Sequence, residues 1–178
     1  MLTERQTERL VMRQVKAEDA ESLFPIWSDP RVTQFMNITT FSHQNEAVNM
    51  INYLNELAEQ QQALRFSIIE KKSGRIIGSC GYQLLDPKNE KTEIGYELGY
   101  PYWRKGYGTE VVKDLIDAAF LKLNLHRIEA KVEPNNVNSI RLLEKVNFIY
   151  EGTLRESEKS VDTYSDLQLY SLLKTDSR

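Results

Sequence analysis

Several short segments of the chain alternate hydrophobic and polar residues, a pattern typical of β-strands that bury one face. In the clearest segment, residues 92–98, Ile94, Tyr96 and Leu98 share one face. The same period predicts strands at residues 9–15 and 127–132, and further strands are predicted at residues 65–70, 76–85, 148–154 and 163–173. We expect the last two to pair in antiparallel fashion and to close the sheet.

Hydrophobic residues at helical spacing occupy stretches between these strands. The longest stretch begins after Gly106 and predicts a helix of about four turns. Its apolar face consists of Val111, Val112, Leu115, Ile116, Ala119, Phe120 and Leu123. A second helix is predicted from Ser42 onward, with Ala47, Ile51, Leu54 and Ala58 on one face.

A further helix is predicted at residues 19–27, and a short helix at residues 137–146, capped by Asn136 or Asn138. Residues 31–41 are apolar but irregular, and predict at most a short helical turn. Three long helices (the first, the second and the central one) with a mostly antiparallel sheet predict an α+β fold rather than a doubly wound α/β fold.

The composition fits one globular domain, because 178 residues with 40% hydrophobic and 28% charged side chains can build a full core over residues 1–178. A net charge of −3 and a pI of about 5.6 give no electrostatic argument for binding nucleic acid or an anionic membrane. No apolar run approaches the ~18 residues of a membrane span, and the N-terminus lacks a signal-peptide core. We therefore expect a cytoplasmic protein.

Metal binding is not expected, because the chain has one cysteine and two isolated histidines. Cys80 lies in a predicted strand, where a small buried hydrophobic residue is the favoured interpretation.

A glycine-containing basic loop separates the central strand from the central helix. Gly106 and Gly108 open the helix, and Arg104 and Lys105 precede it. Because the first N–H groups of a helix lack internal partners and its dipole favours anions, this order predicts a phosphate-binding loop. Val111 replaces the third glycine of a dinucleotide fingerprint, and no Gly-Lys-Ser/Thr follows as in a Walker loop. An ordinary tight strand-to-helix turn remains the alternative.

The loop resembles the acetyl-CoA pyrophosphate loop of the GNAT superfamily of N-acetyltransferases, written Gln/Arg-x-x-Gly-x-Gly/Ala. The phrase I-G-Y-E-L-G-Y-P-Y-W-R-K-G-Y-G-T-E is similar to the version in the ribosomal-protein N-acetyltransferase (Rim-type, RimJ/RimL-like) branch, with Trp103 in place of the usual Gln or Arg. The opening T-E-R-L-V-M-R-Q-V-K-A-E-D-A-E-S-L-F-P-I-W-S-D-P-R-V also resembles this branch.

A third segment, P-N-N-V-N-S-I-R-L-L-E-K-V-N-F, resembles the family pattern N-x-x-S-x-x-x-x-x-K-x-G-F. Asn136, Ser139, Lys145 and Phe148 are in register with the pattern, and Asn147 replaces its glycine. Since asparagine tolerates a left-handed backbone, we expect Asn147 still to end the helix.

The resemblance implies a GNAT-like fold, with a central, mostly antiparallel mixed sheet flanked by helices, and acetyl-CoA as co-substrate without a metal. The residues it implies for acetyl-CoA binding are Tyr96, Leu98, Trp103, Arg104, Lys105, Gly106, Tyr107, Gly108, Thr109, Asn136 and Ser139.

The chemistry of acetyl transfer needs a neutral amine, a polarised thioester carbonyl and a protonated leaving thiolate. By resemblance, Glu158 is the base and Ser139 the acid, since Leu143 occupies the place of a tyrosine that protonates the thiolate in many relatives. Backbone N–H groups of residues 96–99 are expected to meet the carbonyl oxygen where this strand separates from its neighbour.

Other interpretations remain open for each of these residues. Glu158 lies in an acidic segment, residues 151–166, that is also typical of a solvated loop, and Glu93 or Glu97 on the central strand are alternative bases. Ser139 has the alternative role of a residue in the first turn of a helix whose side chain forms a hydrogen bond with the backbone. Four aromatic residues either line an acceptor pocket or fill the core, with the core favoured: Trp27, Phe35, Phe41 and Tyr102.

The resemblance therefore implies an acetyl-CoA-dependent N-acetyltransferase that acts by direct transfer in a ternary complex. The branch suggests the N-terminal amine of a ribosomal protein or peptide as acceptor, and a small amine such as a polyamine is an alternative. It also allows for a homodimer. A non-catalytic acyl-CoA sensor and an unrelated nucleotide-binding module are competing hypotheses, and thiol release from acetyl-CoA with an added amine separates them from the enzyme.

Overall fold

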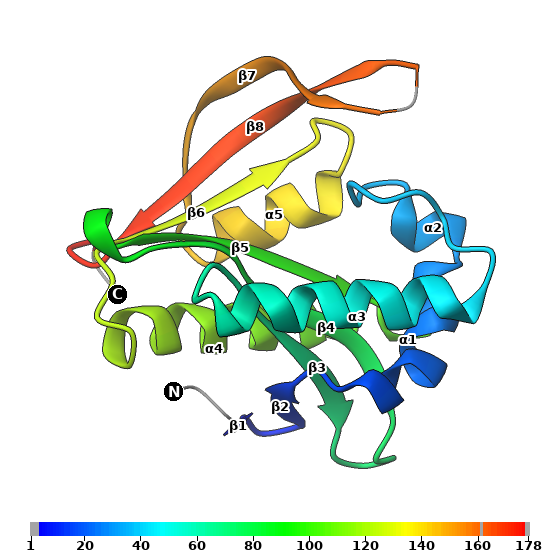
Figure 1. Cartoon of the computed structure of the whole chain (residues 1–178). Helices are drawn as coiled ribbons and strands as arrows, with labels where there is room; N and C mark the ends of the chain where they lie inside the picture. Colours follow the sequence, from blue (N-terminus) through cyan, green and yellow to red (C-terminus); the bar gives the residue numbers. More distant parts are fainter. Residues whose placement is uncertain (1–3, 161, 177–178) are drawn as a thin grey trace.

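The computed structural model describes residues 4–160 and 162–176, in which one mixed sheet has the strand order β1-β2-β3-β4-β5-β6-β8-β7 (Figure 1). The strands are β1 (Glu4–Gln6), β2 (Leu10–Gln14), β3 (Leu64–Glu70), β4 (Ile76–Asp86), β5 (Lys91–Leu98), β6 (Arg127–Val132), β7 (Ile149–Lys159) and β8 (Tyr164–Leu173). The helices are α1 (Ala20–Trp27), α2 (Pro30–Thr33), α3 (Gln44–Glu59), α4 (Tyr107–Leu121) and α5 (Val137–Lys145).

The sheet opens between β5 and β6. These two strands form the sheet's parallel pair, which joins Lys91–Glu93 to Arg127–Glu129, whereas the other neighbouring pairs are antiparallel. Beyond Glu93 the recorded pairing stops, although β5 continues to Leu98 and β6 to Val132. The ends of the two strands diverge as a V, and α5 lies beside the opening (Figure 1).

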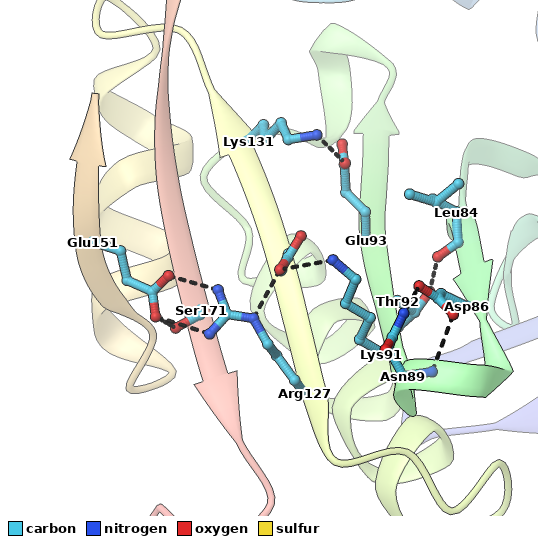
Figure 2. Close-up of polar contacts among 11 residues, drawn as sticks. Leu84, Asp86, Asn89, Lys91, Thr92, Glu93, Arg127, Lys131, Glu151 and Ser171 are labelled. Carbon is cyan, nitrogen blue, oxygen red and sulfur yellow. Dashed lines mark hydrogen bonds and ion pairs between the residues drawn. The ribbon is translucent and has the colours of Figure 1, made fainter. Parts of the chain in front are cut away.

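Charged side chains join the strands at the closed end of the V (Figure 2). The Arg127 guanidinium donates to Glu129 Oε1 at 2.8 Å and to both Glu151 oxygens at 2.6 and 2.9 Å. Ser171 Oγ donates to Glu151 at 2.6 Å, and Lys91 Nζ lies 3.6 Å from Glu129. This network connects β5, β6, β8 and β7 where the divergence begins.

Two clusters of hydrophobic side chains cover opposite faces of the sheet. Val111, Val112 and Leu115 of α4 are fully buried in the cluster that contains Ile94 and Leu98. Across the sheet, a second cluster joins α1 and α3 through Trp27, Ala47 and Ile51. The residues that alternate along β5 therefore divide as the sequence predicts, with Ile94 and Leu98 facing α4.

The fold class and most element boundaries are as predicted. Asn147 has a left-handed φ of 69° directly after α5, as expected for a residue that replaces glycine there. The side chain of Asn136, not Asn138, caps α5 by accepting from Ser139 N–H at 3.3 Å. In the part of the chain that the structure describes, no helix is long and apolar enough to cross a membrane.

Some predictions differ from the structure. The first helix, α1, has only eight residues and is not a long helix. Helix α3 begins at Gln44 rather than Ser42, because Glu46 accepts from the N–H groups of Ser42 and His43 at 2.7 and 2.8 Å. Strand β1 was not predicted. Strand β7 extends to Lys159, so that Glu158 lies in a strand paired with Ser165 and not in a loop.

Candidate active site

The loop before α4 has the backbone geometry of an anion site. Arg104 and Gly106 have left-handed φ values of 58° and 81°, and no described side chain caps the first turn of α4. The first N–H groups of α4 are thus open to a ligand. Gly108 has a packing role as well, because a Cβ added there would lie 2.8 Å from Leu142 Cδ1 of α5.

Arg9, at the start of β2, braces this loop. Its backbone N–H and Nε donate to Glu110 at 2.8 and 2.7 Å, and one guanidinium nitrogen donates to the Lys105 carbonyl at 2.9 Å. The guanidinium carbon also lies 4.3 Å from the centre of the Tyr107 ring. Burial raises the pKa of Glu110, but the bonds from Thr7 and Arg9 outweigh burial and hold it below its usual range. Arg9 thereby compensates a negative charge that would otherwise oppose an anion at this helix end.

A cavity of about 360 Å³, the loop cavity, lies between this loop, the end of β5 and α5. Eight of the expected acetyl-CoA contacts line this cavity: Tyr96, Leu98, Trp103, Arg104, Gly106, Gly108, Thr109 and Asn136. Arg141 and Lys145 of α5 also line it, together with Asn138. Residues 138, 141 and 145 follow helical spacing, which was the signal available in the sequence for this second, cationic wall.

Three expected contacts, Lys105, Tyr107 and Ser139, do not line the loop cavity, and Ser139 lines the larger cavity described below. Tyr107 is buried, and its hydroxyl donates to Glu70, so that only its backbone faces the loop. Lys105 Nζ lies 5.7 Å from the centre of the Tyr102 ring, and its side chain is not among those that line the loop cavity.

A larger cavity of about 680 Å³, the splay cavity, occupies the opening between β5 and β6. Its charged lining consists of four carboxylates and two cations: Glu93, Glu97, Glu133, Glu158, Arg65 and Lys131. The two cavities meet, because the following residues line both: Phe35, Met36, Tyr96, Glu97 and Asn136.

A hydrogen bond joins two candidate residues at this junction. Tyr96 Oη lies 2.7 Å from Ser139 Oγ, and either atom can be the donor. Burial raises the pKa of Tyr96 to about 12, although the bond to Ser139 lowers it, so the phenol is protonated at neutral pH. The sequence placed Tyr96 on the correct face of the central strand without indicating that its hydroxyl reaches Ser139.

Glu158 is half-buried on β7 and lines the splay cavity. Burial is the main reason why its pKa is raised, the negative charges of Glu133 and Glu93 add to the effect, and Lys131 opposes it. No hydrogen bond or ion pair to its carboxylate is recorded among residues 4–160 and 162–176.

The alternative carboxylates are bound to cations. Glu97 is buried and accepts from Trp27 Nε1 at 3.0 Å, from Ser79 Oγ and from the Arg65 guanidinium. Glu93 forms an ion pair of 2.8 Å with Lys131 across the opening (Figure 2).

The backbone of β5 offers fewer free donors than expected. Gly99 N–H is bonded to the Ile77 carbonyl at 2.8 Å, so it cannot meet a substrate. Because antiparallel strands direct alternate residues to their partner, Leu98 N–H points away from β4 toward the opening. The Leu98 carbonyl accepts from Trp103 Nε1 at 2.7 Å. Trp103 therefore ties the loop to the end of β5.

The four aromatic residues divide between the core and the cavities. Phe41 packs edge-on against Trp27, with ring centres 5.8 Å apart, and Trp27 is 2% exposed at the edge of the splay cavity. Phe35 lines both cavities and Tyr102 lines the loop cavity, so for these two the core interpretation is incomplete.

The remaining sulfur and acidic groups give no sign of a metal centre. Cys80 is buried, and burial raises the pKa of its thiol to about 12, as expected for a packing residue. Among the residues described, no three His, Cys, Asp or Glu side chains are grouped so that they could hold a metal ion.

Comparison with known proteins gives the context for this geometry. A family model described as "Acetyltransferase (GNAT) domain" matches residues 9–149. An uncharacterized N-acetyltransferase p20 of Bacillus licheniformis is 49% identical over 94% of this chain and 94% of its own length. The ribosomal-protein-serine acetyltransferase of Escherichia coli is 26% identical over 78% of this chain and 76% of its own. The structure of the microcin C7 self-immunity acetyltransferase, a complex with acetyl-CoA and AMP, is similar in fold, with a TM-score of 0.84 and 20% identity over 94% of this chain and 93% of that one.

Proposed function

Because this chain belongs to the GNAT family of acetyltransferases, we propose that it moves the acetyl group of acetyl-CoA to a primary amine by direct attack in a ternary complex. The observation that carries this proposal is the meeting of two cavities with different charges. The loop cavity has cationic side chains from Arg104, Arg141 and Lys145, which suit phosphates, and the splay cavity has carboxylates, which suit an amine.

Acetyl-CoA fits the loop cavity because uncapped helix N–H groups and cations line the same space. We assign its phosphates to the backbone of residues 106–109 with Arg104, Arg141 and Lys145. Of the other expected contacts, Leu98 and Trp103 line the loop cavity, and Tyr96 and Asn136 line both cavities, at the junction where the acetyl group would be presented.

In the proposed reaction, Glu158 takes a proton from the ammonium form of the acceptor, and the freed nitrogen lone pair attacks the acetyl carbonyl carbon. The C–N bond forms while the C–S bond breaks, and Leu98 N–H stabilises the charge on the carbonyl oxygen. Ser139 protonates the departing thiolate. The nitrogen then loses its second proton to solvent, and solvent returns a proton to Ser139.

The contacts of the candidate carboxylates favour Glu158 as the base. The carboxylates of Glu97 and Glu93 are engaged in ion pairs with Arg65 and Lys131, so they are less free than Glu158 to contact the ammonium of an acceptor. Glu158 has a raised pKa and faces the cavity, which suits a base that works near neutral pH. Tyr96 supports Ser139, because a phenol that donates to Oγ leaves the Ser139 proton free to point at sulfur.

For the acceptor, we propose the N-terminal amine of a protein or peptide. The name of the Escherichia coli relative, a ribosomal-protein-serine acetyltransferase, supports a ribosomal protein as one source of such an amine. We also propose that residues 1–178 act as one domain, since one sheet includes strands from β1 to β8.

The test is release of free thiol from acetyl-CoA when an amine is added, with the acetylated acceptor identified by mass spectrometry. The panel includes N-terminal peptides of ribosomal proteins, polyamines and other small amines. We expect thiol release with at least one acceptor class. Tight binding of acetyl-CoA without thiol release for any amine would contradict the proposal and favour an acyl-CoA sensor.

A further inference from the structure

Helix α3 carries two apolar stripes, one buried in the core and one that borders both the core and the splay cavity. Ala47 and Ile51 are fully buried against α1. Beside them, Met50, Tyr53 and Leu57 follow the spacing i, i+3, i+7, and all three line the splay cavity together with Leu54. The helical face predicted from the sequence includes Ala47, Ile51 and Leu54 but not Met50, Tyr53 or Leu57.

The second stripe, called here the α3 wall, is only partly covered by the rest of the protein. Tyr53 is 55% exposed, and Met50, Leu54 and Leu57 are half-buried. The side chains that join the α3 wall around the cavity are also apolar, with Met36 and Ile38 from the segment after α2. An apolar surface of this kind beside a cavity is typical of a ligand site.

The wall that the strands contribute to the same cavity has more carboxylates than cations, four against Arg65 and Lys131. Glu93, Glu133 and Glu158 come from β5, the end of β6 and β7, and only Glu93 has a recorded cation partner within the described residues. A ligand that satisfies both walls must combine a positive charge with a large apolar group.

We propose that the α3 wall is a subsite for a bulky apolar substituent next to the amine that is acetylated. The substituent packs on Met50, Tyr53 and Leu57 while the ammonium faces Glu158. This inference rests on the proposed function and adds the class of acceptor, either a peptide whose first residue is large and hydrophobic or a free arylalkylamine.

The first experiment compares kcat/KM for peptides that differ only in their first residue, Leu, Phe, Ser or Asp, alongside free phenylethylamine and ethylamine. Since removal of apolar contacts of this size changes specificity by roughly 10–200-fold, we expect Leu and Phe to exceed Ser by about tenfold or more. The peptide and free-amine arms distinguish the two sources of the apolar group.

The second experiment uses the variant Tyr53→Ser, which removes an exposed side chain and should leave the fold intact. We expect it to lower kcat/KM for Phe-first peptides severalfold more than for Ser-first peptides, without changing acetyl-CoA affinity. Leu121→Ser is the matched control, because Leu121 is 67% exposed on α4 and lines neither cavity. The control should leave both values unchanged.

Binding of phenylethylamine and ethylamine to the protein with coenzyme A, measured by calorimetry, keeps the inference testable if turnover is not detected. Equal turnover and equal binding of all amines, unchanged by Tyr53→Ser, would overturn the α3 subsite and leave the proposed function intact. Preferential, Tyr53-dependent binding of phenylethylamine without any thiol release would support the subsite and contradict the proposed function.

Discussion

Glu158 differs from Glu93 and Glu97 in the partners of its carboxylate. Glu93 and Glu97 form ion pairs with Lys131 and Arg65, respectively. Glu158 is instead partly buried and lies near the negative charges of Glu133 and Glu93. Both influences disfavour the ionised form, so its pKa lies above the usual range of a glutamate. A carboxylate of this kind accepts a proton more readily than an exposed one.

We therefore predict that Glu158→Gln lowers kcat by roughly 10²–10⁴-fold and leaves acetyl-CoA affinity unchanged. The base must be deprotonated, so activity falls as pH drops below its raised pKa, and the variant should lose this acidic limb. Because Glu133 raises the pKa of Glu158, Glu133→Gln should move the limb to lower pH. The measurement is the pH–rate profile of each variant.

Glu156→Gln, on the same strand, is the control and should keep both kcat and the acidic limb. If Glu158→Gln keeps full kcat while a folded Glu97→Gln variant loses both kcat and the limb, the base is on β5 and the assignment is wrong.

Ser139 and Tyr96 form the other pair whose roles depend on contact. Ser139→Ala should lower kcat less than Glu158→Gln does, because water can protonate a thiolate. If Tyr96 acts by orienting Ser139, Tyr96→Phe should reduce kcat in the wild type and have little further effect in Ser139→Ala. A double-mutant cycle on kcat measures this coupling. Additive losses would show that Tyr96 does not act through Ser139.

The sequence predicted these residues to different extents. Ser139 and Asn136 followed from family spacing; the structure places Asn136 where the two cavities meet and Ser139 in the lining of the splay cavity. The bond between Tyr96 and Ser139 was not predicted, because it joins residues 43 positions apart that approach only when α5 packs beside β5. The raised pKa of Glu158 likewise depends on β5 and β6 approaching β7.

At the scale of elements, the N-terminus of α4 combines ligand binding with helix packing. Gly108 lies against Leu142 of α5, and Gly106 approaches Arg9, whose guanidinium would be 3.3 Å from an added Cβ. A substitution at Gly108 therefore changes packing as well as charge, and the two effects need separate variants.

We predict that Gly108→Asp abolishes measurable acetyl-CoA binding, because it adds a negative charge where phosphates bind, whereas Gly108→Ala weakens binding less. Both variants add the same Cβ next to Leu142, so their difference reports the effect of the carboxylate group, its charge together with its bulk. Calorimetry with acetyl-CoA measures it. Unchanged affinity in Gly108→Asp would show that the phosphates bind elsewhere.

Helices and strands could be predicted from the sequence where the element buries one face and exposes the other. Strand β6 alternates between buried residues and residues that are half-buried or exposed, and its predicted bounds agree with the structure. Strand β7 is an edge strand whose residues are mostly exposed on both faces, so its second half has the composition of a polar loop. Only its pairing with β8 makes it a strand, and the sequence does not display that pairing.

At the scale of the whole molecule, the site depends on a sheet that is paired at one end of β5 and open at the other. The network of Arg127, Glu129, Glu151 and Lys91 lies at the paired end. Figure 2 shows it together with the ion pair between Glu93 and Lys131. The backbone ladder between β5 and β6 is short, and the network adds side-chain contacts across it. We expect this network to contribute to the stability of the whole fold.

The pH dependence of that contribution follows from Glu151. The bonds from Arg127 and then Ser171 lower its pKa to about 2, from an ordinary value of 4.5. A carboxylate with a lowered pKa stabilises the folded state fully above its unfolded pKa, and this stabilisation is lost as pH falls toward the folded value. Because the Glu151 side chain is 36% exposed, solvent screening makes the effect smaller than the shift alone suggests.

We predict that Glu151→Gln lowers the free energy of unfolding at pH 7, and that the difference from wild type shrinks as pH falls from about 4.5 toward 2. Urea unfolding at pH 7, 5, 4 and 3 measures this difference. Glu8→Gln is the control, since Glu8 is exposed in the turn between β1 and β2 and lies outside the network, and it should show little change. A deficit in Glu151→Gln that is the same at pH 3 as at pH 7 would mean that the lost charge is not the cause. No deficit at any pH would mean that the short ladder between β5 and β6 closes the V without this network.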